Sequence, residues 1–91
     1  MITASSPAPI DVPSVEAGRA LIDEVDRDIQ RLLAHRAQIS RAIQALRVAA
    51  GEPRVQHQRE NEVIAGYRRA LGRPGVAVAL AALGYCRGDA G

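Results

Sequence analysis

Two arginines project from one face of a helical pattern, and the first of them occupies a position where an apolar residue is expected. Apolar side chains recur at steps of three and four through Leu32 and Ile39, and the position between them on the same stripe is Arg36. Arg47 follows eleven residues later, about 20° away around a helix and about 16 Å along its axis. Because a guanidinium on a buried stripe is costly unless an anion meets it, the pair predicts a site that holds opposite ends of a small anion.

Polar residues also interrupt the apolar pattern at the start of the next helical segment. Helical steps of three and four from Tyr67 toward the N-terminus pass Val63 and then reach Glu60, Arg59 and Gln56. Together with the two arginines of the first segment, these three residues predict a charged pocket inside a helix bundle, the place where such folds put ligand sites.

Each of these signals also has a simpler structural explanation. A single arginine on a stripe is more often a snorkelling or register-setting residue, and this remains an alternative for Arg36. The Arg59-Glu60 pair on its own is typical of a solvated helix face. Polar residues on both sides of one connecting loop favour a site over these explanations.

Other residues that could do chemistry lack the partners that the chemistry needs. His35 and His57 have no cysteine or carboxylate at metal-ligand spacing. Cys86 is the only cysteine and has no evident activating base. The chain contains no glycine-rich phosphate loop. We therefore predict no metal site, no cofactor and no cysteine nucleophile.

Helices must position these residues, and the sequence predicts three of them. The first spans about 14–50, with Ser14 as its N-cap and no proline inside it. The second spans about 56–71 and the third, which is short and rich in alanine, about 74–87. The apolar residues assigned to the inner face of the second helix are Val63, Ile64, Tyr67 and Leu71, and the third helix carries Val76, Leu80 and Leu83.

The ends of the chain differ in composition from its middle. Residues 1–13 are rich in Ser, Ala and Pro and have no apolar period, so they predict a disordered N-terminal arm. The helical domain is then expected over 14–91.

The first helix is too long for the rest of the chain to cover. Roughly 35 residues at about 1.5 Å each give about 52 Å, more than the width of a domain of this size. A second copy of the helix is the most economical cover for its apolar stripe. We therefore predict an all-α chain of three helices that forms an intertwined helical-bundle homodimer. The stripe consists of Ile22, Val25, Ile29, Leu32, Ile39, Ile43 and Leu46.

Charge is distributed unevenly along the chain. All twelve basic residues are arginines, and the formal net charge is +2. Residues 1–30 hold six acids and two arginines, whereas 31–87 hold ten arginines and three acids. The second part predicts a positive region with an anionic partner. The acidic first part and the low net charge argue against nucleic acid as that partner.

The sequence shows neither the pattern of a secretory signal peptide nor that of a membrane-spanning helix. The first thirteen residues have neither the charged nor the apolar region of a signal peptide. No apolar run approaches the roughly 20 residues of a membrane span. The lone Cys86 fits a reducing compartment. We expect no membrane association and a cytoplasmic location.

The segment from about Gly18 to Leu71 resembles the AroQ-type chorismate mutases. Its opening, Arg19-Ala-Leu-Ile-Asp-Glu-Val-Asp26, looks like the start of the family's first helix. The block that ends at Arg36, the cation at 47 and the Arg-Glu pair at 59–60 look like three further family positions. Each motif alone is weak, but the spacing across four positions is fairly specific.

The resemblance implies an enzyme that rearranges chorismate to prephenate in phenylalanine and tyrosine biosynthesis. It implies that Arg19 reaches across the dimer into the other protomer's site. Arg19 and Arg36 would hold the substrate carboxylates, with help from Arg59. Arg47 would face the ether oxygen, and Glu60 would accept a hydrogen bond from the ring hydroxyl.

Two departures from the family pattern leave alternatives open. Gln56 stands where many members carry an aspartate near the ring hydroxyl, so isochorismate pyruvate lyase and 4-amino-4-deoxychorismate mutase activities remain alternatives. The third helix is too short to supply the family's serine and glutamine. Such brevity resembles the short δ subclass, and it implies activation by 3-deoxy-arabino-heptulosonate 7-phosphate (DAHP) synthase as a partner. From another class, a non-catalytic helical dimerisation module is the remaining alternative.

Overall fold

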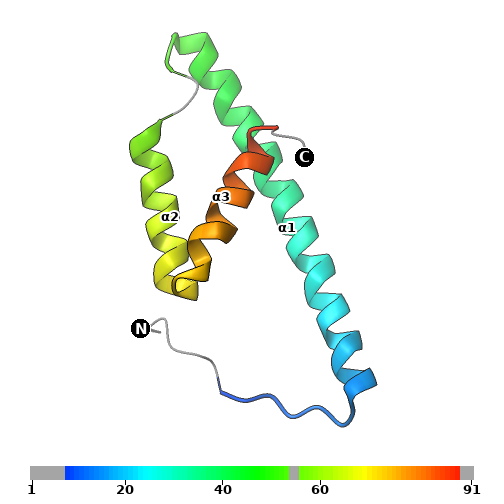
Figure 1. Cartoon of the computed structure of the whole chain (residues 1–91). Helices are drawn as coiled ribbons and strands as arrows, with labels where there is room; N and C mark the ends of the chain where they lie inside the picture. Colours follow the sequence, from blue (N-terminus) through cyan, green and yellow to red (C-terminus); the bar gives the residue numbers. More distant parts are fainter. Residues whose placement is uncertain (1–7, 54–55, 89–91) are drawn as a thin grey trace.

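The chain folds into three α-helices. The structure is a computed structural model that describes residues 8–53 and 56–88. Helix α1 spans Val15–Ala50, α2 spans His57–Leu71 and α3 spans Pro74–Cys86 (Figure 1). The prediction of an all-α chain with a long first helix is confirmed, and each helix end lies within one residue of its predicted place.

Local sequence explains where α1 begins and ends. The Ser14 hydroxyl accepts a hydrogen bond from the backbone N–H of Ala17 at 3.0 Å, which caps the first turn. Gly51 ends the helix in the left-handed conformation, with φ of 74°, and its N–H donates to the carbonyl of Val48 at 3.1 Å. This turn starts the loop that leads the chain back along α1 to α2.

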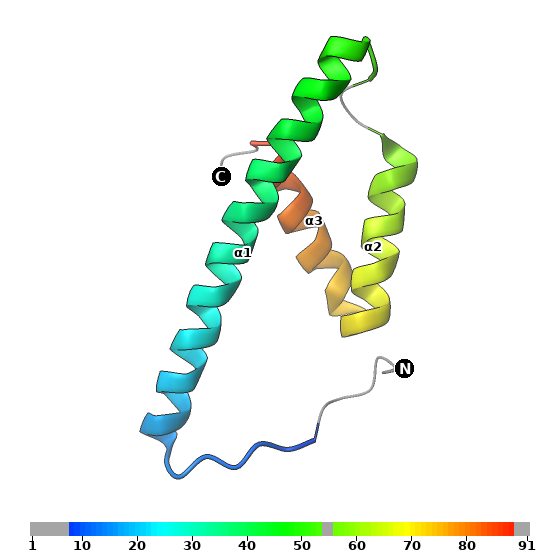
Figure 2. The same cartoon turned by 180° about the vertical axis from the view of Figure 1, so that it is seen from behind.

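Helices α2 and α3 form a hairpin that lies beside the C-terminal half of α1 (Figures 1 and 2). Helix α3 packs against both α2 and α1, whereas within the described residues α1 and α2 do not pack directly on each other. The N-terminal half of α1 stands away from the hairpin in both views. The molecule measures 55 × 25 × 25 Å, so the 36 residues of α1 span its full long dimension.

Small side chains make the buried face of α3. Its buried residues are Gly75, Ala79, Ala82, Leu83 and Cys86. The four small buried residues are Gly75, Ala79, Ala82 and Cys86, and their spacing of four, three and four residues places them on one face of the helix. Small side chains on this face let the neighbouring helices approach closely.

The prediction for the inner face of α2 is partly wrong. Val63, Ile64 and Tyr67 are half-buried, but Leu71 is 55% exposed. Leu80 on α3 is 53% exposed as well. The buried face of α3 instead consists mainly of small residues.

Gly75 lies close to the backbone of α2, and it gives a test of the hairpin. A Cβ built on Gly75 would lie 2.3 Å from the carbonyl oxygen of Tyr67. Backbone cannot yield cheaply, so we expect Gly75→Ala to lower the free energy of unfolding by about 2 kcal/mol or more. Urea denaturation at matched protein concentration measures this.

Gly66→Ala is the matched control for that substitution. A Cβ at Gly66 would meet only the Arg69 guanidinium, at 3.8 Å. Alanine is the better helix former there, so we expect unchanged or slightly higher stability. Equal stability of the two variants would contradict the close α2–α3 contact.

The apolar stripe of α1 is uncovered in the single chain. Its seven residues are between 44% and 72% exposed, and Ala37 is the only residue of α1 that is buried. Neither α2 nor α3 covers this stripe, as the helix length predicted.

Some predictions fall partly outside the described residues. Of the predicted N-terminal arm, residues 1–7 lie outside them, and 8–14 form no helix or strand. The predicted domain limits at 14 and 91 remain predictions. Among the described helices, none combines the length and the apolar character that a membrane crossing requires.

Candidate active site

A cavity of about 290 Å³ opens between α1 and α2, at the point where the two helices fail to pack on each other. The end of α3 forms its third wall. Five of the six residues predicted from the sequence line it: Arg36, Arg47, Gln56, Arg59 and Glu60. Residues from both sides of the connecting loop therefore do meet, and the solvated-face explanation fails for Glu60, which is half-buried.

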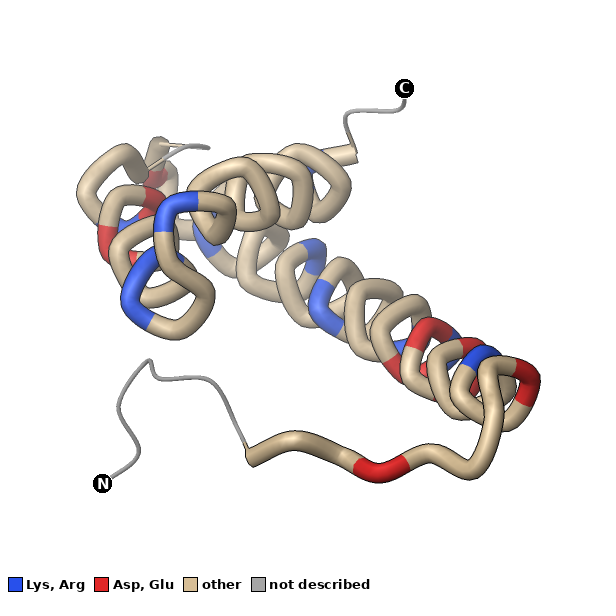
Figure 3. The backbone as a smooth tube through the Cα atoms, turned by 60° about the horizontal axis from the view of Figure 1, so that its bottom comes forward, with Lys and Arg blue, Asp and Glu red and all other residues tan. Residues whose placement is uncertain are grey.

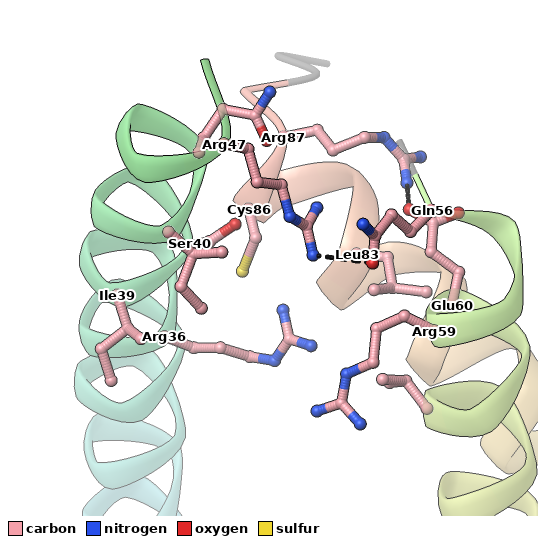
Figure 4. A pocket seen from close by; sticks show the side chains of 13 residues that line it. Arg36, Ile39, Ser40, Arg47, Gln56, Arg59, Glu60, Leu83, Cys86 and Arg87 are labelled. Atoms are coloured by element: carbon pink, nitrogen blue, oxygen red, sulfur yellow. Dashed lines mark hydrogen bonds and ion pairs between the residues drawn. The ribbon is translucent and has the colours of Figure 1, made fainter. Parts of the chain in front are cut away.

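The wall from α1 is one face of that helix, and it carries both polar and apolar residues. Arg36 and Arg47 are both half-buried and extend into the space toward α2 (Figure 4). Ile39 and Ile43 lie between them on the same face. This arrangement follows from the spacing of eleven residues, because three helical turns bring a side chain back to nearly the same direction.

The wall from α2 comes from the first turn of that helix. Gln56 is its N-cap residue, and its Oε1 accepts a hydrogen bond from Nη2 of Arg47 at 3.3 Å across the cavity. Arg59 is exposed and points toward Arg36 from the opposite side, while its Nη1 lies 3.4 Å from Oε1 of Glu62 (Figure 4). The start of α2 thus faces the middle of α1 with one cation, Arg59, one amide, Gln56, and one carboxylate, Glu60.

The wall from α3 adds a residue that sequence reasoning missed. Arg87 caps the C-terminal end of α3, lines the cavity, and its Nη1 lies 2.5 Å from Oε2 of Glu60. The sequence held a weak signal for it, since Arg87 follows the buried Leu83 by one helical turn. The glycines on either side of it instead marked the segment as a helix end.

Arg19 does not reach the cavity of its own chain. It is exposed on α1, seventeen residues before Arg36, which is about 25 Å along the helix axis. The structure of the single chain therefore leaves Arg19 apart from the other five predicted residues.

The cavity carries an excess of positive charge. Among the described residues, four arginines line it against one carboxylate, that of Glu60. Acidic residues of α1 gather near its N-terminal end, away from the cavity (Figure 3). Within residues 8–53 and 56–88, no group of three or more His, Cys, Asp or Glu side chains could hold a metal ion. The site is thus built to attract a small anion with more than one negative group.

Apolar side chains between the arginines complete the site. Ile39, Ile43, Val63 and Leu83 line the same space. A ligand with a hydrocarbon ring and carboxylates at its edges can place the ring on these residues and the carboxylates on the guanidiniums. Such a cavity can hold a flexible dianion in one conformation and place a cation beside a chosen oxygen.

Comparison with known proteins agrees with this geometry. Residues 18–82 match the family model of chorismate mutase type II. The intracellular chorismate mutase of Mycobacterium tuberculosis H37Rv is 39% identical over 80 residues, covering 88% of this chain and 75% of that protein. That of Mycolicibacterium smegmatis is 38% identical over 86 residues, covering 93% and 83%.

A solved structure shares the fold as well as the sequence. A chain of the non-covalent complex of DAHP synthase and chorismate mutase from Corynebacterium glutamicum, with bound transition state analog, superposes with a TM-score of 0.78. It is 32% identical, and the match covers 85% of this chain and 93% of that one. The chain therefore belongs to the chorismate mutase type II family of enzymes.

Proposed function

We propose that this chorismate mutase binds chorismate in the cavity between α1 and α2 and rearranges it there to prephenate. The observation that carries the proposal is the meeting of Arg36 and Arg47 from α1 with Arg59 from α2 around one space with an apolar lining. Chorismate is a ring with two carboxylates, so its charges and its hydrocarbon surface match that lining.

The reaction explains why the site consists of cations and an apolar surface. An ether C–O bond breaks as a C–C bond forms in one cyclic step, so the substrate itself supplies all the electrons. The protein has to fold the enolpyruvyl side chain over the ring, which is catalysis by orientation. It also has to stabilise the ether oxygen, which gains negative charge as its bond breaks.

Each cavity residue has a role in this proposal. Arg36 binds a substrate carboxylate, with Arg59 assisting, because a guanidinium binds carboxylates through two parallel hydrogen bonds. Arg47 faces the ether oxygen. Glu60 accepts a hydrogen bond from the ring hydroxyl, and Gln56 holds Arg47 in place while its amide nitrogen faces the substrate.

A homodimer completes the proposed site. The part of the exposed stripe that lies N-terminal to the cavity, Ile22, Val25, Ile29 and Leu32, offers an apolar surface, and a second copy of α1 has the same pattern. In such a dimer Arg19 of one chain reaches the cavity of the other, which accounts for its distance from the cavity of its own chain. Arg19 then binds the second carboxylate.

Two further parts of the proposal concern location and partner. We propose a cytoplasmic location, supported by the names of the mycobacterial relatives, which are intracellular chorismate mutases. DAHP synthase is the proposed partner, because the structurally similar chain from Corynebacterium glutamicum forms a complex with a DAHP synthase. Family membership disfavours a non-catalytic dimerisation module.

The alternatives to the proposed function differ in substrate. They arise from Gln56, which stands where many family members carry an aspartate near the ring hydroxyl. The experiment is to incubate the purified chain with chorismate, isochorismate and 4-amino-4-deoxychorismate, each with and without DAHP synthase, and to identify the products. We expect prephenate from chorismate, and a higher rate when DAHP synthase is present. Pyruvate release from isochorismate alone, or turnover of the amino compound alone, would replace the proposed function with one of its alternatives.

A further inference from the structure

The ion pair between Glu60 and Arg87 differs from the other ion pairs described in the chain. Asp28 with Arg31 and Glu62 with Arg59 are three residues apart on one helix, and all four side chains are 58% to 71% exposed. Glu60 and Arg87 are 27 residues apart, and their side chains are 25% and 35% exposed. A tertiary, partly enclosed pair is worth more than an exposed pair along a helix.

The position of this pair links two walls of the cavity. Glu60 stands in the first turn of α2, and Arg87 stands at the end of α3. The two helices are joined at Gly72, at the opposite end of the hairpin. The side chain of Arg87 extends past Cys86 toward α2 and meets Glu60 beside Gln56 (Figure 4).

The cavity contains several arginines with which the Glu60 carboxylate could form an ion pair. Among the described residues that line the cavity it is the only carboxylate, and Arg36, Arg47 and Arg59 line the same space. A carboxylate that turned toward any of these three would neutralise a cation that the substrate needs. The contact with Arg87 engages Oε2 of Glu60, and a carboxylate can accept several hydrogen bonds at once.

We infer that Arg87 is a positioning residue that acts through Glu60. It holds the Glu60 carboxylate in the orientation that accepts the hydrogen bond from the substrate hydroxyl. It also keeps Glu60 from pairing with the three arginines that bind the dianion. The end of α3 thus takes part in catalysis without contacting the reacting atoms. The inference rests on the proposed role of Glu60.

A double-mutant cycle on the full-length chain tests the inference. Steady-state kinetics with chorismate are measured for Arg87→Ala, Glu60→Ala and the double variant, with thermal unfolding of each. We expect Arg87→Ala to lower kcat/KM by about 10-fold, through a higher KM and a lower kcat, since it removes a hydrogen bond to a charged group. In the Glu60→Ala background, which lacks the acceptor, the same substitution should have almost no further effect.

Two more variants separate positioning from a structural role. Arg87→Lys keeps the charge but not the planar fork, so we expect it to recover part of the loss. Arg31→Ala removes an ion pair far from the cavity and should leave kcat and KM unchanged. A loss of stability alone would lower the amount of active enzyme without changing KM.

The outcomes distinguish this inference from the proposed function. Full activity of Glu60→Ala would remove the role of Glu60 and, with it, the inference. A defect in Glu60→Ala together with full activity of Arg87→Ala would overturn the inference alone. Equal losses from Arg87→Ala in both backgrounds would also overturn it, because Arg87 would then act independently of Glu60.

Discussion

Replacing Arg47 with alanine should lower kcat by about 10² to 10³. Arg47 is half-buried on the cavity wall, and Gln56 holds its guanidinium with a hydrogen bond of 3.3 Å. We propose that this cation faces the ether oxygen, whose negative charge develops only in the transition state. Loss of one such preorganised donor has an effect of this size in other enzymes.

The kinetic signature of this variant is as informative as its magnitude. An interaction that forms only in the transition state changes kcat and kcat/KM together and leaves KM nearly unchanged. Arg47→Lys keeps a cation near the same place and should be less severe. A rise in KM with an unchanged kcat would show that Arg47 contacts the substrate elsewhere and would contradict its assigned role.

Replacing Arg36 with alanine should instead weaken substrate binding. Arg36 extends into the cavity from the middle of α1, where we propose that it holds a carboxylate in the ground state and the transition state alike. We expect KM to rise by about 100-fold or more, while the molecular mass in solution stays that of a dimer. A monomer would mean that Arg36 sets the helix register, the simpler explanation for an arginine on this stripe.

Pairing Arg36→Ala with Arg19→Ala tests whether sites are shared between chains. Each variant alone should be nearly inactive. In a mixed dimer, the cavity of the Arg19→Ala chain has its own Arg36 and receives an intact Arg19 from the other chain. Random mixing should therefore restore about one quarter of the wild-type sites. No recovery after co-refolding would show that Arg19 is not donated across an interface.

The predicted residues that the structure brings together around the cavity share one property. Arg36, Arg47, Glu60 and Arg59 are charged residues on helix faces whose pattern is otherwise apolar, and a charge on a face that is expected to be buried needs an explanation that an anion supplies. The ends of α1 were also predictable, because Ser14 and Gly51 act through local backbone chemistry that needs no tertiary contact.

The features that sequence reasoning missed depend on how the helices pack. The inner face of α3 was hidden because its buried residues, such as Gly75 and Ala79, are small. Large side chains carry most of the periodic signal, and here the side chains of Leu71 and Leu80 are more than half exposed. Arg87 was missed because its partner is 27 residues away, and only the return of α3 toward α1 brings it to the cavity.

Titration calorimetry with a transition-state analogue tests the central claim most directly, because such compounds bind more tightly than substrates wherever a site is complementary to the transition state. Wild-type chain and the Arg31→Ala control should bind one analogue per chain with equal affinity. Arg36→Ala and Arg47→Ala should each bind it about 100-fold more weakly or worse. Undiminished affinity in both variants would contradict a site in which these arginines hold the dianion.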